Sequence, residues 1–460
     1  MMRFLIGFLI AAIGTIAVSE TRVPESQAEI SIGFVPVVQK AAPAVVNIYA
    51  RRVVNGQASL FRNDPFFRDF FRNFGSTRPR VQNSLGSGVI LSDDGIVVSN
   101  FHVVGGATDI RVVLNDQREF SAKLLLSDQE SDLAILKLED AEAMPALTLR
   151  DSDTVQVGEL VLAIGNPFGV GQTVTSGIVS GLARSGSAAG GGRGYFIQTD
   201  APINPGNSGG ALVDINGHLI GINTRILSRS GGSNGIGFAI PAALVEQFVA
   251  QARENKSRFE RPWAGISAQP VTSDVAEGLG IKGPGGIIIT QIHPASPFAE
   301  AGFKTGDVIA EVDGAAVNTA SEMVFRMAIA GLGEETKIRR LREGIDEQVT
   351  LKLGLPPEDP PRATQKMSEG TQLPGLEIST INPAVISELG LPFNAEGVVV
   401  VDPGAKAARA GLRKGDILHE VNGESALNPA TVEKALMRTS RWLWLEVQRG
   451  KRRSSLRLRL

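Results

Sequence analysis

Residues 206–210, with the sequence GNSGG, place one hydroxyl group among glycines. Strand-like segments precede and follow them, so Ser208 is expected in a tight, exposed turn. A nucleophilic serine needs such exposure, together with backbone N–H groups that stabilise the developing oxyanion. Because glycine–serine turns are common, Ser208 is a candidate nucleophile only if a base accompanies it.

The base of a catalytic serine is usually a histidine, and the sequence contains four. His218 lies in an expected hairpin turn, His293 precedes a proline, and His419 aligns with an alanine in an internal repeat. These three are expected to be structural or surface residues. His102 differs because it lies where strand-like residues 97–99 run into a turn. His102 is therefore the predicted general base.

A third residue, a carboxylate, should orient the imidazole and stabilise the imidazolium. Asp132 is the best candidate, because it is a lone acid directly before the apolar residues 133–138. The alternative is that Asp132 only ends a turn or a strand, and Asp128 is the second candidate. The order His102, Asp132, Ser208 is that of chymotrypsin and differs from the orders of subtilisin and the α/β-hydrolases.

The elements that must position these residues are short strands. Between about residues 40 and 240, β-branched segments alternate with glycine, asparagine and aspartate, which predicts an all-β barrel or sandwich. Apolar residues at helical spacing predict a closing helix over 241–252.

Composition limits the class of protein. The chain has 460 residues, of which 43% are hydrophobic and 20% charged, so it is expected to form two to four globular domains. A formal net charge of −2 argues against nucleic acid as the main partner. Cysteine is absent and only four histidines occur, so we expect no disulfide, no cysteine nucleophile and no metal site.

The second half of the chain contains a repeat. Residues 301–314 realign on residues 410–423 with their apolar positions preserved. The chain should therefore end in two copies of one small domain, at about 259–354 and 373–460. Prolines and polar residues over 355–372 predict a semi-rigid spacer between the copies.

The amino terminus has the features of an export signal. Residues 4–18 are apolar or small, a stretch shorter than the ~20 residues of a membrane-spanning helix. A small-x-small site at residues 26–28 predicts cleavage there, so residues 1–28 are expected to be a signal peptide. An uncleaved membrane anchor and a buried core helix are the alternatives.

Two segments outside these motifs are unusual. Residues 61–74 contain six phenylalanines, so we expect them to cover a cleft or meet another subunit, with a local hydrophobic cluster as the alternative. Residues 185–194 are rich in glycine and serine, which predicts a flexible loop. No GK[ST] or GxGxxG pattern accompanies them, so phosphate binding is not expected.

The three motifs in order, followed by the tandem repeat, closely resemble the Deg/HtrA family of serine proteases. The resemblance covers nearly the whole chain after the predicted signal. It implies a mainly β fold, with a chymotrypsin-like double β-barrel protease domain over residues 29–255 followed by two α/β PDZ domains. It further implies an exported, periplasmic endopeptidase without cofactors that degrades unfolded or misfolded proteins. By the same resemblance the protein forms a homotrimer or larger assemblies of trimers and also acts as a chaperone.

The resemblance also assigns individual residues. The oxyanion hole falls on the backbone N–H groups of Gly206, Asn207 and Ser208. Residues 61–74 match the family's inhibitory loop, and Arg184 matches the arginine that relays ligand occupancy.

The family's primary pocket corresponds to residues 223–240, which contain no acidic residue. This favours small or medium aliphatic side chains before the cleaved bond. Phe101 departs from the family pattern, because a small or polar residue commonly precedes the catalytic histidine there.

The repeats resemble PDZ domains, which bind an extended carboxy-terminal peptide as an added strand. In the first copy, Trp263, Ala264, Gly265 and Ile266 match the loop that holds the peptide carboxylate. Residues 374–376 match that loop less well, so the second copy is expected to serve in assembly rather than in peptide binding.

Two other functions compete with this interpretation. One is a peptide-binding chaperone or scaffold that no longer cleaves, against which the complete set of catalytic residues argues. The other is a membrane-anchored protease that cuts one signalling protein. Such family members commonly carry a single PDZ domain, so the tandem copy argues against the second.

Overall fold

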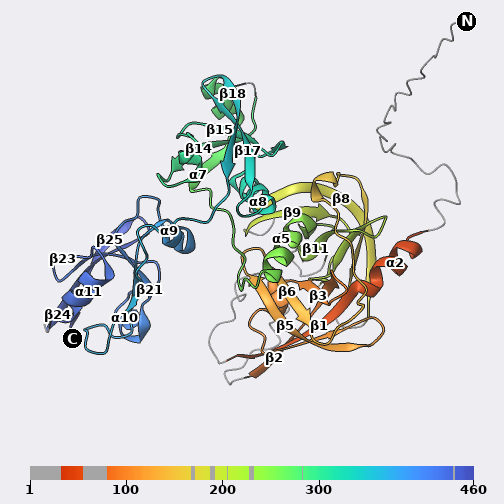
Figure 1. Ribbon diagram of the computed structural model, residues 1–460, viewed down its shortest axis with the longest axis horizontal. Helices are drawn as coiled ribbons and strands as arrows, with labels where there is room; N and C mark the ends of the chain where they lie inside the picture. The colour runs from red at the N-terminus through yellow and green to blue at the C-terminus, as the bar shows by residue number, and fades with distance from the viewer. Residues whose placement is uncertain are drawn as a thin grey trace, which may run out of the picture.

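The computed structural model describes residues 33–54, 80–166, 171–186, 192–204, 206–226, 233–281, 283–438 and 441–459. In these ranges the chain forms two closed β-barrels followed by two further sheets (Figure 1). The predicted mainly β fold class is thereby confirmed. The predicted signal peptide, the phenylalanine-rich residues 61–74 and the centre of the glycine-rich loop lie outside the described residues. None of the described helices combines the length and the hydrophobicity that a membrane span requires.

The first barrel carries His102 and Asp132 at neighbouring strand ends. It closes in the order β1 (Val45–Val54), β2 (Arg80–Ile90), β3 (Ile96–Ser99), β6 (Leu133–Leu138), β5 (Glu119–Asp128) and β4 (Asp109–Val113). Strands β3 and β6 are almost entirely buried, as their continuous apolar sequences require. They pair antiparallel with Ser99 opposite Ala134, so the residues after β3 lie beside the residue before β6.

The second barrel carries Ser208. It closes in the order β10 (Ala211–Asp214), β11 (Leu219–Ile226), β12 (Gly237–Pro241), β9 (Gly192–Thr199), β8 (Thr173–Gly186) and β7 (Leu160–Gly165). Ser208 lies just before β10, whose Ala211 is opposite Ile222 of β11. Helix α5 (Ala242–Arg253) follows and buries the Phe248 ring against the Phe259 ring, with centroids 4.0 Å apart. This helix agrees with the one predicted over residues 241–252.

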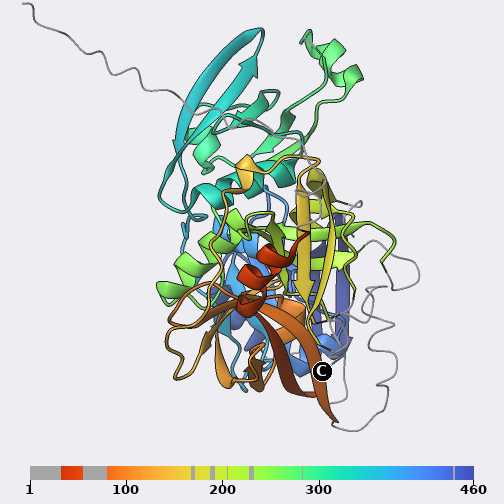
Figure 2. The same ribbon diagram turned by 90° about the vertical axis from the view of Figure 1, so that its right-hand side faces the viewer.

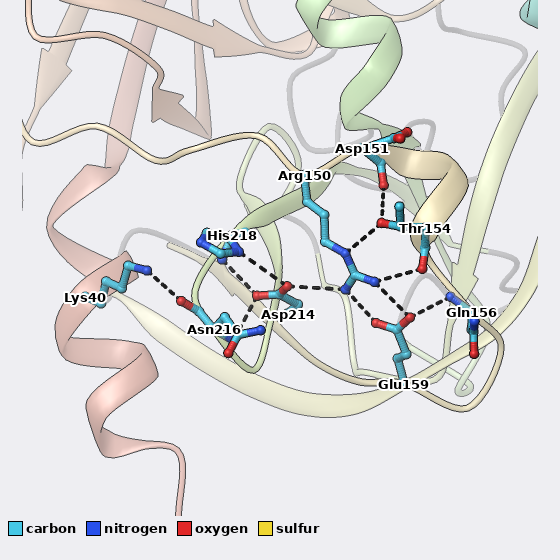
Figure 3. A network of polar contacts seen from close by, with 9 residues as sticks. All are labelled: Lys40, Arg150, Asp151, Thr154, Gln156, Glu159, Asp214, Asn216 and His218. Atoms are coloured by element: carbon cyan, nitrogen blue, oxygen red, sulfur yellow. Dashed lines mark hydrogen bonds and ion pairs between the residues drawn. The ribbon is translucent and has the colours of Figure 1, made fainter. Parts of the chain in front are cut away.

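A polar network fixes the hairpin between β10 and β11 (Figure 3). The Asp214 carboxylate accepts from the backbone N–H groups of Asn216 and His218, both at 2.9 Å, and from Arg150 at 3.3 Å. Lys40 of helix α2 (Val35–Ala41) donates to the Asn216 carbonyl at 2.7 Å. The network therefore ties helix α2 to the hairpin whose first strand follows Ser208. His218 lies in the turn, where the sequence places it.

Each repeat forms one sheet of the same design. The first has the strand order β13 (Ile266–Pro270), β14 (Ile287–Ile292), β15 (Val308–Val312), β17 (Glu335–Arg342) and β18 (Ile345–Lys352), with β16 (Ala315–Ala316) paired to β15. The helices of this repeat are α6 (Ser273–Leu279), α7 (Pro297–Glu300) and α8 (Ala320–Ala330). Figure 2 shows the hairpin β17–β18 pointing away from the barrels.

The second repeat follows the same plan. Its strand order is β19 (Gln365–Lys366), β20 (Glu377–Thr380), β21 (Val398–Asp402), β22 (Ile417–Val421), β24 (Trp442–Arg449) and β25 (Arg452–Arg459), with β23 (Glu424–Ser425) paired to β22. Its helices are α9 (Pro383–Leu389), α10 (Gly404–Arg409) and α11 (Pro429–Leu436). The predicted spacer has no regular structure as far as Thr364, whereas its end supplies β19 and the buried side chain of Met367.

Helix α8 of the first repeat lies against β9 and α5 of the protease barrels (Figure 1). The Phe325 ring stacks on the Tyr195 ring of β9, with centroids 3.9 Å apart and an angle of 7° between the planes. Next to it, Arg326 forms an ion pair with Asp153. Because Phe325 is buried within the core of the barrels, the first repeat is docked on the protease and not merely tethered to it.

Candidate active site

His102 and Asp132 are in contact at the ends of β3 and β6. His102 belongs to the short helix α4 (Phe101–Val104), which begins right after Asn100. Its Nδ1 lies 2.8 Å from Asp132 Oδ2, and its backbone N–H donates to Asp132 Oδ1 at 3.0 Å. Both side chains are buried. The fold therefore brings the predicted base and carboxylate together.

The backbone of Asp132 is held in an unusual conformation. Its φ of +55° lies in the left-handed region, which non-glycine residues seldom adopt. The Asp132 carbonyl accepts from Asn100 Nδ2 at 2.9 Å and from the Phe101 N–H at 3.2 Å. The segment that carries His102 thus also fixes the turn that aims the carboxylate at His102.

The environment of Asp132 keeps it ionised. Burial raises the pKa of Asp132, but the charge of His102, hydrogen bonds from His102 and Thr224, and the charge of Arg225 outweigh burial and leave this pKa below its usual range. Because an ionised carboxylate can only accept a hydrogen bond, the Asp132 carboxylate keeps the imidazole proton on Nδ1. Nε2 is then the nitrogen able to accept a proton.

Thr224 of β11 connects Ser208 with the His102–Asp132 pair. The Ser208 hydroxyl donates to the Thr224 carbonyl at 3.0 Å. The Thr224 hydroxyl donates to Asp132 Oδ2 at 2.6 Å. The three predicted residues, drawn from two barrels, are therefore gathered around one residue of β11.

Ser87 of β2 supports the turn of Ser208 from the first barrel. Its N–H donates to the Ser208 carbonyl at 2.9 Å, and its hydroxyl donates to the Gly206 carbonyl at 2.7 Å. A Cβ at Gly209, where φ is +84°, would lie 2.0 Å from the Ser87 carbonyl oxygen. Only glycine fits this position, which explains the glycine that follows the serine.

The backbone N–H groups of the turn are not equivalent. The N–H of Asn207 donates to the Asn204 carbonyl at 3.0 Å, so it is not available to an oxyanion in this arrangement. The prediction that all three N–H groups form the hole would therefore need Asn207 to leave this hydrogen bond. Among the described residues, none accepts a hydrogen bond from the N–H of Gly206 or Ser208. Within the described part of the chain, both polar atoms of the buried Asn207 amide also lack a hydrogen-bond partner.

Asp128, the second candidate for the carboxylate, is engaged elsewhere. It binds the guanidinium of Arg261, whose Nη1 lies 3.3 Å from Asp128 Oδ1. The same guanidinium donates to Ser131 Oγ at 2.6 Å. Asp128 therefore ties the segment between protease and first repeat to the turn before Asp132, and His102 contacts Asp132 instead.

Arg184 lies in strand β8, directly before the flexible loop predicted over residues 185–194. Its Cα is paired with that of Phe196 of β9, and the ladder between β8 and β9 continues past it to Gly186 through several irregularities. Residues 185, 186 and 192–194 of the predicted loop therefore belong to the two strands, which stay paired despite these irregularities. Of the predicted pocket at residues 223–240, residues 227–232 lie outside the described part of the chain.

In the first repeat, residues 263–266 lie at the edge of the sheet, where the chain enters β13. Gly265 has a φ of +61°, and a Cβ there would lie 2.8 Å from both Ser296 Cβ and the Trp263 ring. The Ser296 hydroxyl donates to the Ala264 carbonyl at 2.6 Å, and the His293 N–H donates to the Gly265 carbonyl at 2.8 Å. This segment leads into β13, the edge strand, alongside which α8 lies.

Ser87 and Thr224 are the site residues that sequence reasoning missed. The glycines on both sides of Ser87 give the same signal that singled out Ser208, since they allow close approach of another backbone. Thr224 lies in an ordinary β-branched strand, and nothing in its neighbourhood distinguishes it from a core residue.

The chain matches known protein families over each of these parts. A family model described as a trypsin-like peptidase domain matches residues 86–222. PDZ-domain models match residues 262–353 and 397–449.

Several relatives are similar over most of their length. The periplasmic pH-dependent serine endoprotease DegQ of Escherichia coli is 37% identical over 90% of this chain and 89% of its own. The periplasmic serine endoprotease DegP of the same organism is 38% identical over 86% of this chain and 80% of its own. A probable periplasmic DegP-like serine endoprotease of Marinomonas is 37% identical over 87% of both chains.

Solved structures give the same result. The HtrA-type protease AlgW with a tripeptide is 40% identical, with a TM-score of 0.54, and the match covers 70% of this chain and 97% of that one. AlgW with a decapeptide is 41% identical, with a TM-score of 0.52 over 70% and 99% of the two chains. On this likeness over sequence, domains and fold, the chain belongs to the DegP/HtrA family of PDZ-containing proteases and is a serine endopeptidase.

Proposed function

We propose that Ser208 is the nucleophile, His102 the general base and Asp132 the residue that orients His102. The observation that carries this assignment is the chain of contacts from Ser208 through Thr224 to Asp132 and His102. His102 takes the hydroxyl proton at Nε2 as Ser208 Oγ attacks the peptide carbonyl, and then gives that proton to the leaving amine. Water resolves the acyl-enzyme by the same route.

Covalent labelling of the nucleophile tests this assignment. A fluorophosphonate, which reacts with activated serines, should add to the full-length protein at one position, and peptide mass mapping should locate it at Ser208. Modification at another serine would contradict the assignment. The rate at which the same preparation digests unfolded casein should fall in proportion to the fraction of protein that is labelled.

The N–H groups of Gly206 and Ser208 are proposed to bind the tetrahedral oxyanion. They belong to the turn that positions Ser208 Oγ. The N–H of Asn207, which lies between them, already donates to the Asn204 carbonyl. Two such donors suffice to stabilise the charge of an acyl-transfer intermediate. The Asn207 amide, which has no partner among the described residues, lies within the same turn, so a small rearrangement there would alter the hole directly.

The substrates are proposed to be unfolded or misfolded proteins, recognised in part through their carboxy termini. An extended chain would add to β13 as a further strand, with its carboxylate at Gly265 and Ile266 and with α8 along its other side. The AlgW structures that resemble this chain are named with peptides, which supports a peptide-binding first repeat. Retention of substrates without cleavage, as by a chaperone, follows from the same peptide sites.

Regulation is proposed to pass from this groove to the protease through α8. The helix that borders the groove is the one that stacks Phe325 on Tyr195 of β9, and β9 pairs with β8, which carries Arg184. A peptide that moves α8 therefore acts on the strand next to Arg184. Arg184 is proposed to relay peptide occupancy from this strand towards the turn of Ser208.

Arg326→Gln should weaken this relay, because it removes the ion pair with Asp153 that joins α8 to the protease. We expect the stimulation of casein cleavage by a carboxy-terminal peptide to fall about two- to fivefold, as the loss of one partly buried ion pair allows. Arg339→Gln is the matched control, since Arg339 pairs with Glu311 and Asp346 inside the first repeat. Equal stimulation in both variants would show that α8 docking does not transmit occupancy.

The protein is proposed to act in the periplasm after removal of residues 1–28, with an uncleaved amino-terminal anchor as the alternative. The names of the relatives support the periplasmic location. A homotrimer, or a larger assembly of trimers, is proposed on the family resemblance, and native mass spectrometry with and without an unfolded substrate tests it.

A further inference from the structure

The last hairpin of the chain, β24–β25, has an unusual charge. Its residues, 442–459, include six basic side chains and one acidic one, whereas the whole chain has a formal charge of −2. The acidic residue, Glu446, is itself neutralised by Arg453, with 2.8 Å between Arg453 Nε and Glu446 Oε1. The hairpin is therefore a strongly basic element on a protein that is acidic elsewhere.

One face of this hairpin combines the basic side chains with tryptophan. The antiparallel register places Trp442 opposite Arg459 and Trp444 opposite Arg457. The Arg457 guanidinium lies over both indoles, 4.0 Å from the Trp442 centroid and 4.8 Å from the Trp444 centroid. Trp444 is 48% exposed, which is high for so large an apolar side chain. We call Trp442, Trp444, Arg453, Arg457 and Arg459 the tryptophan–arginine face.

The equivalent hairpin of the first repeat shows that the fold does not require such a face. Residues 335–352 of β17–β18 occupy the same place in their sheet, carry five basic and four acidic side chains, and contain no aromatic residue. One ion pair is common to both repeats, Arg342 with Asp307 and Arg449 with Asp416. That shared pair holds the hairpin to its sheet, so the additional cations and indoles of the second hairpin need another explanation.

Protection of a sheet edge does not explain the face either. Charged side chains on an edge strand prevent unwanted strand pairing. The first hairpin achieves this with balanced charges, of which Arg339 pairs with Asp346. Protection of an edge requires neither an excess of one sign nor half-exposed tryptophan.

We propose that the tryptophan–arginine face binds the surface of a bilayer rich in anionic phospholipid. Tryptophan prefers the headgroup region, where its apolar ring is buried and its N–H remains hydrated. Arginine binds phosphate oxygens with its planar fork of donors. Because the rest of the chain is net acidic, an anionic surface attracts this hairpin and repels the remainder, which orients the molecule with the second repeat towards the lipid. This inference does not depend on the catalytic assignment.

The test uses the full chain with vesicles of phosphatidylglycerol and phosphatidylcholine, and with vesicles of phosphatidylcholine alone. We expect co-sedimentation only with the anionic vesicles, weakened by salt. Binding should shift the tryptophan emission to shorter wavelength, and the shift reports on the hairpin because the third tryptophan, Trp263, is already buried. Emission that stays unchanged on sedimenting vesicles would contradict the proposal.

A pair of double variants tests the residues of the face. Arg457→Gln with Arg459→Gln removes the two cations opposite the tryptophans and should lower the vesicle partition coefficient roughly thirtyfold, at the usual contribution of each basic residue near a charged surface. Lys337→Gln with Lys352→Gln removes the same charge from the first hairpin and should have little effect. Equal loss in both double variants would mean a general charge effect and would overturn the proposal. Two results would assign the face to a protein partner instead. One is that the full chain binds polyglutamate but not vesicles, and the other is that the chain self-associates and the first double variant abolishes this self-association.

Discussion

Replacing Ser208 by alanine should abolish hydrolysis while leaving the protein folded and able to hold substrates. If Ser208 Oγ attacks the peptide carbonyl, its removal eliminates the acyl-enzyme but leaves the N–H groups of Gly206 and Ser208 in place. Losses of triad members in serine proteases amount to roughly 10⁴–10⁶ in rate, so cleavage of unfolded casein should fall below detection. The variant should also no longer react with a fluorophosphonate.

The structure predicts that this variant folds. Among the residues that the structure describes, the hydroxyl makes one hydrogen bond, to the Thr224 carbonyl at 3.0 Å, whereas the turn is held by backbone contacts from Ser87 and by Gly209. Loss of one such bond costs about 1 kcal/mol, so the thermal midpoint should shift by only a few degrees. Ser176→Ala, an exposed serine of the same barrel, is the matched control and should keep wild-type activity.

The same variant separates an enzyme from a pure binder. A protein that only binds unfolded chains would be unaffected by Ser208→Ala, because the peptide site of the first repeat is remote in sequence from residue 208. We expect the variant to suppress aggregation of an unfolded protein as well as wild type does, and to retain that protein during purification. Residual casein cleavage in a clean preparation of the variant would refute Ser208 as the nucleophile.

The sequence could propose the three residues because each has a local signature that narrows the choice. His102 and Asp132 lie next to apolar strands and Ser208 lies among glycines, and the need of a serine nucleophile for a base and a carboxylate then selected the first two. The antiparallel pairing of β3 with β6 then brings the first two into contact. Thr224 has no such signature, because its function arises only when β11 of the second barrel meets the turn of Asp132 in the first.

The contacts between domains could not be predicted from the sequence for a similar reason. Helical periodicity shows that Phe325 is on an apolar face of α8, but not that this face meets Tyr195 of the protease as well as its own sheet. Glycine content likewise predicted a flexible loop over residues 185–194, because composition does not reveal that β8 and β9 continue through bulges into this range. In both cases the deciding partner is distant in the chain.

Asp132→Asn should reduce turnover about 10⁴-fold with little change in the fold, because the side chain keeps its shape and loses its charge. Both carboxylate oxygens accept hydrogen bonds, Oδ1 from the His102 N–H and Oδ2 from Thr224 and His102 Nδ1. An amide cannot accept at both positions. When the NH₂ group of the introduced asparagine occupies the Oδ2 position, it donates a hydrogen bond to His102 Nδ1. The imidazole proton then resides on Nε2, and Nε2 can no longer accept the proton of the Ser208 hydroxyl.

The free energy of unfolding should also depend on the negative charge of Asp132. Because the pKa of Asp132 is lowered in the folded protein, its carboxylate stabilises the fold above the pKa of an unfolded aspartate, about 3.9, and this contribution is lost as the pH falls through the lower folded value. Wild type should therefore be more stable than Asp132→Asn near neutral pH, and the difference should shrink in acid. Chemical denaturation at a series of pH values measures it.

The matched control is Asp128→Asn, which removes the other candidate carboxylate. Asp128 binds Arg261 and is not in contact with His102, so its loss should loosen the attachment of the first repeat and lower turnover by no more than a few-fold. The comparison is decisive because both residues lie in the same short segment and both changes remove one negative charge. If turnover falls 10⁴-fold in Asp128→Asn and stays near normal in Asp132→Asn, the orienting role belongs to Asp128. If turnover falls equally and modestly in both variants, neither residue is the carboxylate that the mechanism requires beside His102.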